Sequence, residues 1–226
     1  MLAGGGIVGS IRDMDKPART PYSAAEALEC LKEGNERFMR GEARFPTAQK
    51  EVLADLAKGQ QPYATILGCS DSRVPPELVF DAGCGELFVI RVAGNVLGDS
   101  ILGTLQYAGV QLHTPLFVVL GHGGCGAVEA ALASKFQGTE QKRRIEILLE
   151  NILPALDGLD PAQPHDVLMH EAVEANVRRT VEEILKTPEA KARVAEGKMT
   201  LVGAIYDFES GGVRFLEPRG GMQSSG

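Results

Sequence analysis

The chain has 226 residues and a net charge of -7 at neutral pH. This length is enough for one α/β domain that buries most of its apolar surface. The acidic balance argues against nucleic acid and against an anionic membrane as partners, because the short basic clusters at 142–144 and 178–179 have no flanking aromatics. No apolar run approaches the roughly 20 residues of a membrane-spanning helix.

The four cysteines are too few to form a disulfide scaffold in a chain of this length. Such sparse cysteine usage is typical of a protein in a reducing compartment. We therefore expect a cytoplasmic location.

The composition divides the chain into three parts. Residues 1–21 are rich in glycine, proline and charge without any lasting period, so we expect a flexible N-terminal arm. Residues 22–217 carry the periodic apolar pattern of a single α/β domain, and 218–226 are expected to form a flexible tail.

Two helices are predicted before the first strand. Ser23 and Glu26 form a capping-box pattern, which predicts a helix over 23–39 that stops before Gly41. A second, shorter helix is expected over 47–58, where Gly59 would end it.

Strands and helices alternate from Gln60 onward, which predicts a mainly parallel sheet with helices on both faces. About four parallel strands and one antiparallel edge strand are expected, at 63–68, 87–92, 116–121, 201–206 and 213–216. One helix is expected to begin near Pro76. Others are expected over 100–113, 126–136, 140–153, 166–186 and 187–197. In the helix over 166–186, apolar residues recur at every fourth position and indicate a face buried in the core or at a subunit interface: Met169, Val173, Val177, Val181 and Leu185.

Chemically active side chains follow two of the predicted strands. Cys69, Asp71 and Arg73 come directly after the strand over 63–68, and His122 and Cys125 come after the strand over 116–121. Open α/β sheets place their ligand sites at the carboxyl ends of the strands. Two cysteines and one histidine are ligands that zinc prefers, and three protein ligands leave a fourth position for water or hydroxide.

Cys69 alone could be a small buried hydrophobe, and Asp71 could be a turn-capping residue beside a surface arginine. However, the pairing of Cys-x-Asp-x-Arg at 69–73 with His-x-x-Cys at 122–125 resembles the β-class carbonic anhydrases, and the resemblance extends over 23–216. It implies one Zn²⁺ per chain, bound by Cys69, His122 and Cys125. It also implies that zinc-bound hydroxide hydrates carbon dioxide reversibly to bicarbonate.

The resemblance assigns further roles at the site. Asp71 would accept a hydrogen bond from the zinc-bound water, and Arg73 would keep that carboxylate ionised and in place. Four residues match positions that line the carbon dioxide pocket in the family: Gln60, Phe88, Ala93 and Tyr107. Gln61, next to Gln60, is an alternative for the first position. A homodimer or homotetramer is implied as well, with some active-site residues supplied across the interface.

Two other functions stay open at this point. One is hydrolysis of carbon disulfide or carbonyl sulfide at the same metal site, as relatives perform. The other is a non-catalytic metal-binding module. The presence of Asp71 and Arg73 argues against the module, because a structural site needs a fourth ligand more than it needs a pair of residues that orients water.

Overall fold

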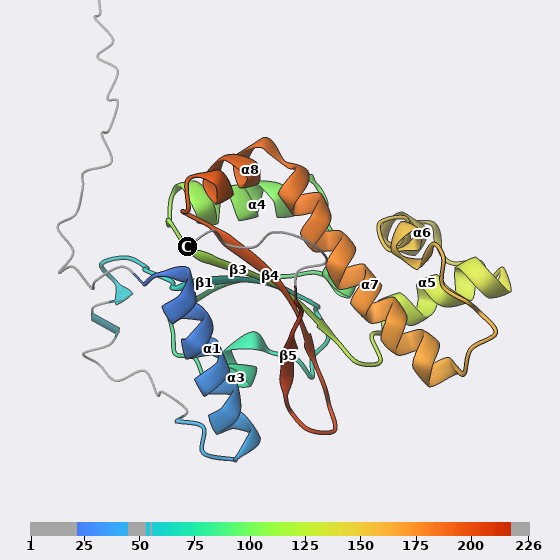
Figure 1. Cartoon of the computed structure of the whole chain (residues 1–226), viewed down its shortest axis with the longest axis horizontal. Coiled ribbons are helices and arrows are strands. Elements are labelled where there is room, and N and C mark those ends of the chain that lie inside the picture. Colours follow the sequence, from blue (N-terminus) through green and yellow to red (C-terminus); the bar gives the residue numbers. More distant parts are fainter. Residues whose placement is uncertain (1–21, 45–52, 55, 218–226) are drawn as a thin grey trace, which may run out of the picture.

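A computed structural model describes residues 22–44, 53–54 and 56–217 (Figure 1). Five strands form one sheet in the order β2-β1-β3-β4-β5. Their bounds are Ala64–Gly68 for β1, Leu87–Arg91 for β2, Leu116–His122 for β3, Thr200–Tyr206 for β4 and Val213–Phe215 for β5. The first four strands are parallel, and β5 runs antiparallel to β4 at the edge. The predicted α/β fold with a mainly parallel sheet is confirmed.

Helices cover both faces of this sheet (Figure 1). On one face lie α1 (Ala24–Met39) and the short α3 (Pro76–Val79). On the other lie α4 (Asp99–Val110), α7 (His165–Lys186) and α8 (Pro188–Ala195). Successive strand residues therefore enter different cores: Ile66 packs with α1 and α3, whereas Leu67 packs with α4 and α7. The central strands β1 and β3 are buried along their whole length, as parallel strands covered on both faces should be.

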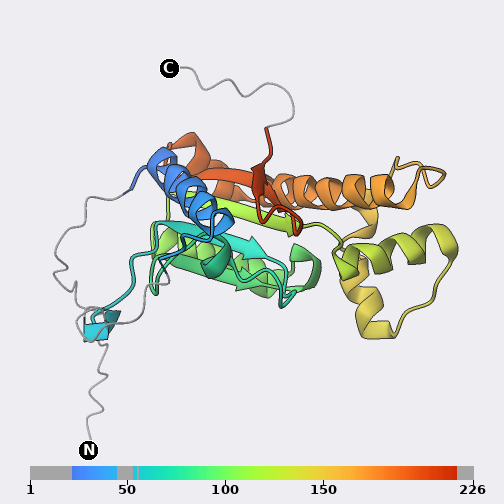
Figure 2. The same cartoon turned by 90° about the horizontal axis from the view of Figure 1, so that it is seen from below.

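Beyond the carboxyl end of β3, the chain makes an excursion that lies beside the first half of α7 (Figure 2). It consists of α5 (Gly126–Gln137), α6 (Arg143–Leu149) and the 3₁₀ turn η2 (Leu153–Leu156). The predicted single helix over 140–153 is wrong. The α-helix covers only Arg143–Leu149. Pro154, which lacks an amide hydrogen and crowds the preceding turn, lies in the first turn of η2 instead.

Two other helix predictions need correction in detail. Helix α4 ends at Val110 rather than at residue 113, because His113 adopts a left-handed φ of 54° and turns the chain towards β3. On α7, Met169, Val173 and Val177 are buried as predicted. Val181 and Leu185 are only half-buried, and the buried positions beyond Val177 are Thr180 and Ile184. A spacing of four residues overshoots the 3.6 residues of a helical turn, so the buried stripe drifts around the helix.

The predicted N-terminal helix is confirmed by its cap. The Ser23 backbone amide donates to Glu26 at 2.8 Å, and the Ser23 hydroxyl accepts from the Glu26 amide at 3.2 Å. The predicted helix over 47–58 lies largely outside the described residues, as do the predicted arm 1–21 and tail 218–226. The boundaries of the single domain stay a prediction. Among the described helices, none combines the length and the apolarity needed to cross a membrane.

Candidate metal centre

The neighbouring parallel strands β1 and β3 bring three side chains of types that can bind metals together at the carboxyl ends of the strands. Gly68 at the end of β1 pairs with Leu120, so Cys69 follows β1 close to the point where His122 ends β3. Cys125 then caps α5 after a tight turn. All three side chains are buried, and their donor atoms lie within 4.8 Å of one another. Among the described residues, this is the group whose geometry could hold a metal ion.

The tautomer of His122 leaves a nitrogen lone pair for a ligand. Its Nδ1 lies 2.9 Å from the carbonyl oxygen of Gly123, and because a carbonyl only accepts, Nδ1 carries the hydrogen. Its Nε2 is buried and has no hydrogen-bond partner within the described part of the chain. Buried polar atoms are rarely left unpaired, so a lone pair placed among two thiols fits a zinc ligand.

The two thiols influence each other's ionisation. Their Sγ atoms lie 4.0 Å apart. A hydrogen bond from Cys125 lowers the pKa of Cys69 below its usual value, and the same contact raises the pKa of Cys125. The pair therefore offers one ready thiolate, and a cation at this point would favour loss of the second proton.

A carboxylate stands beside this cluster in a fixed orientation. Arg73 donates to both oxygens of Asp71, from Nε at 2.9 Å and from Nη2 at 2.7 Å, and its backbone amide adds a bond at 3.0 Å. These hydrogen bonds hold the pKa of Asp71 far below its usual range, so the carboxylate is ionised. Oδ2 of Asp71 lies 3.8 Å from Nε2 of His122, which places an acceptor next to the unpaired nitrogen.

Two further residues support the site without having been predicted. Arg91 ends β2 and donates to the carbonyl oxygens of Cys69, at 2.9 Å, and of Asp71. A charged residue that closes an apolar strand was a signal available in the sequence. Phe208 places its ring 4.2 Å from the guanidinium carbon of Arg73 and 5.5 Å from the His122 ring. No local pattern marks Phe208, because it lies in the turn between β4 and β5.

The four residues predicted to line a substrate pocket lie in different elements. Ala93 opens the 3₁₀ turn η1 (Ala93–Asn95), whose Gly94 amide donates to Sγ of Cys69 at 3.3 Å. Phe88 on the edge strand β2 and Tyr107 on α4 contact each other, with ring centroids 6.1 Å apart. Gln60 is exposed and precedes β1. The structure thus places Ala93 beside the metal centre and pairs the two aromatics at the edge of the sheet.

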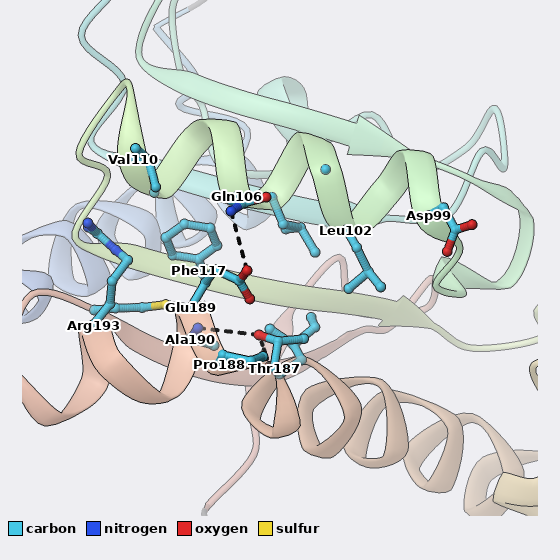
Figure 3. A pocket seen from close by; sticks show the side chains of 15 residues that line it. Asp99, Leu102, Gln106, Val110, Phe117, Thr187, Pro188, Glu189, Ala190 and Arg193 are labelled. Carbon is cyan, nitrogen blue, oxygen red and sulfur yellow. Dashed lines mark hydrogen bonds between the residues drawn. The ribbon is translucent and has the colours of Figure 1, made fainter.

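A cavity of about 360 Å³ lies between α4, β3 and α8 (Figure 3). Its walls are mostly apolar, and Gln106 donates to Glu189 across it at 3.4 Å. None of the predicted site residues belongs to its lining. The cavity has room but lacks the ligands, so the candidate chemistry belongs to the strand ends.

Comparison with known proteins identifies the family of this chain. Residues 64–213 match the family model described as carbonic anhydrase. The chain is 39% identical over 201 residues to carbonic anhydrase 2 of Mycobacterium tuberculosis, an alignment that covers 86% of this chain and 92% of that protein. It also resembles the solved β-carbonic anhydrase CafA of Aspergillus fumigatus, with 27% identity, a TM-score of 0.67, and coverage of 86% of this chain and 92% of that one. A second solved β-carbonic anhydrase, CcaA, has 26% identity, a TM-score of 0.68, and coverage of 84% and 95%.

The chain belongs to the β-class carbonic anhydrase family. The predicted resemblance is therefore confirmed. The buried Cys-His-Cys cluster is consistent with zinc, and the roles of the individual residues stay predictions.

Proposed function

We propose that this protein interconverts carbon dioxide and bicarbonate, with one Zn²⁺ per chain held by Cys69, His122 and Cys125. The observation that carries the proposal is the convergence of these three buried donors, with an unpaired histidine nitrogen among them. Three protein ligands are typical of catalytic zinc sites, whereas structural sites are closed by four. Membership of the carbonic anhydrase family supports the same reaction.

Zinc in such a site acts as a Lewis acid that lowers the pKa of a coordinated water towards about 7. The chain's own contribution is orientation. Asp71, kept ionised by Arg73, can only accept a hydrogen bond, so it would accept one from the attacking water and thereby direct a lone pair of that water towards the substrate carbon. Arg91 holds the backbone on either side of this arrangement.

The substrate pocket follows from the same proposal. Carbon dioxide is small and apolar, so its pocket should have apolar walls and few polar groups. We assign this lining to Gln60, Phe88, Ala93 and Tyr107. Tyr107 is 49% exposed in the single chain, which suits a homodimer or homotetramer in which aromatics from one copy complete the pocket of the next. Sedimentation analysis of the purified protein measures the oligomeric state.

The experiment that tests the function is a stopped-flow assay of carbon dioxide hydration together with metal analysis. We expect about one zinc per chain, and we expect Cys125→Ser to lose both metal and activity. Cys84→Ser is the matched control, because Cys84 is a free and exposed cysteine. Activity in metal-free protein, or equal loss of zinc in the Cys84 variant, would contradict the proposed ligands.

The same preparation separates the reactions that one metal site could support. Assays with carbonyl sulfide and carbon disulfide beside carbon dioxide identify the preferred substrate. Bound zinc without turnover of any of the three would indicate a non-catalytic module. The cytoplasmic location stays a prediction from the sequence.

A further inference from the structure

Two buried polar side chains interrupt the apolar face of α7. Asn176 is 1% exposed and Thr180, one turn later, is 5% exposed. The Nδ2 of Asn176 donates to the carbonyl oxygen of Gly94 at 2.8 Å, and the hydroxyl of Thr180 donates to that of Asn95 at 3.4 Å. Burying a polar side chain is unfavourable unless it is hydrogen-bonded, so both residues are placed to hold η1.

The turn that they hold has an unusual backbone. Gly94 has a φ of 68° and Asn95 a φ of 44°, in the left-handed region that non-glycine residues rarely adopt. A Cβ added to Gly94 would lie 2.8 Å from Ile152 and 3.1 Å from Ala127. Strained backbone of this kind persists only when its surroundings fix it, and it concentrates at functional sites.

The strained turn directs one amide at the candidate metal centre. The N–H of Gly94 donates to Sγ of Cys69 at 3.3 Å, and the carbonyl of the same residue accepts the bond from Asn176. Gly94 therefore connects the buried side chain of Asn176 on α7 to the sulfur of Cys69. An N–H donor withdraws electron density from a thiolate and fixes its direction, and such outer partners commonly change metal affinity or activity by about 10-fold to 100-fold.

We propose that Asn176 is a positioning residue for the metal centre. It acts through Gly94 to set the orientation of the Cys69 thiolate and the electron density on its sulfur. The proposal rests on the metal site proposed above. Asn176 itself need not contact substrate or metal, and Thr180 assists it through the weaker bond to Asn95.

The test uses the full chain loaded with Co²⁺, whose thiolate charge-transfer absorption reports directly on the sulfur ligands. Asn176→Leu removes the donor at similar volume. Without the bond to its carbonyl, Gly94 should no longer hold its N–H against Sγ of Cys69. We therefore expect the band to move to lower energy, because a thiolate with a weakened N–H donor is richer in electrons. We also expect release of the metal to a chelator to become about 10-fold faster or more. Neither readout requires turnover.

Thr114→Val is the matched control. Thr114 is fully buried, its hydroxyl lies 2.8 Å from that of Thr65, and it donates to the carbonyl of Ala108. However, it precedes β3, so it lies at the amino-terminal ends of the strands, away from the candidate metal centre. This change removes a comparable buried hydrogen bond, so it should lower stability while leaving the absorption band and the release rate unchanged.

Thr180→Val keeps the test decisive if Asn176→Leu fails to fold. It preserves shape and removes only the 3.4 Å bond, so it should produce a smaller shift in the same direction. Wild-type spectra and release rates in the folded variants would overturn the role of Asn176, and so would equal shifts in Thr114→Val. Absence of a thiolate band in the wild-type protein would instead overturn the proposed metal site.

Discussion

Two aspartates ten residues apart, Asp71 and Asp81, both pair with arginine but occupy very different surroundings. The side chain of Asp81 is 1% exposed and follows α3 in a left-handed turn. One of its oxygens accepts from Nε of Arg37 at 2.6 Å and Nε of Arg44 at 3.0 Å, and the other accepts from the Arg44 amide at 2.8 Å. Every bond joins Asp81 to α1 or to the segment that follows α1.

The carboxylate of Asp71 is bound by a single arginine, Arg73, and faces the unpaired Nε2 of His122. An aspartate–arginine pair is thus no guide to function by itself. The bonds to Asp81 are all used to join elements, whereas Asp71 keeps one side turned towards a cluster that could bind metal. The remaining neighbours of an ion pair therefore decide whether it serves structure or chemistry.

The largest effect on turnover is expected from Asp71→Asn. The amide can present an NH₂ where the attacking water needs an acceptor, so we expect turnover to fall by about 100-fold or more. Zinc content and stability against urea should change little, because the proposed metal ligands remain. Stopped-flow kinetics with metal analysis measures this, and full activity in the variant would remove Asp71 from the mechanism.

Asp81→Asn should show the reverse pattern. It leaves two arginines without their carboxylate, but both are partly exposed, so we expect a loss of about 1–3 kcal/mol in the free energy of unfolding. Turnover per folded molecule should match the wild type. Urea denaturation followed by circular dichroism gives the first quantity. A large fall in turnover at full zinc occupancy would show that Asp81 is not purely structural.

The contribution of Asp81 to the free energy of unfolding should depend on pH. Burial alone would raise the pKa of Asp81, but the hydrogen bonds from Arg37 and Arg44 outweigh it and lower the pKa below its usual value. The stabilisation is therefore present above the unfolded pKa of about 3.9 and is lost as the pH falls through the folded value. The free energies of unfolding of wild type and Asp81→Asn should therefore approach each other as the pH falls below about 4 and through the folded pKa. A constant difference down to strongly acidic pH would contradict this assignment.

The two aspartates also differ in how much of their surroundings can be predicted from the sequence. Cys69, Asp71 and Arg73 lie within five residues at a strand end, and the alternation of strands and helices predicts parallel strands whose carboxyl ends lie on the same side of the sheet. Local pattern and topology were therefore enough to place the candidate metal centre. The direct pairing of β1 with β3 is known only from the structure. The Asp81 network was not predicted, because it joins residues far apart in the sequence through a left-handed turn that no local pattern marks.

The same limit applies to the supporting residues. Asn176 lies on the apolar face of a predicted helix, but only tertiary packing shows that it binds the carbonyl of Gly94. The pairing of Phe88 with Tyr107 likewise depends on how α4 packs against β2. The predicted helix ends were wrong where Pro154 and His113 change the direction of the chain. Sequence periodicity predicts which elements form better than where each one ends.

The smallest expected effect concerns Phe208, which distinguishes the surroundings of Arg73 from those of the arginines at Asp81. Its ring lies 4.2 Å from the Arg73 guanidinium, and exposed cation–π contacts of this kind are weak. Phe208→Leu should free Arg73 only in part, so we expect turnover to fall about twofold to fivefold with zinc retained. Phe208→Tyr keeps the aromatic face and should stay near wild type. Equal losses in the two variants would show that the ring acts through packing against His122 rather than through Arg73.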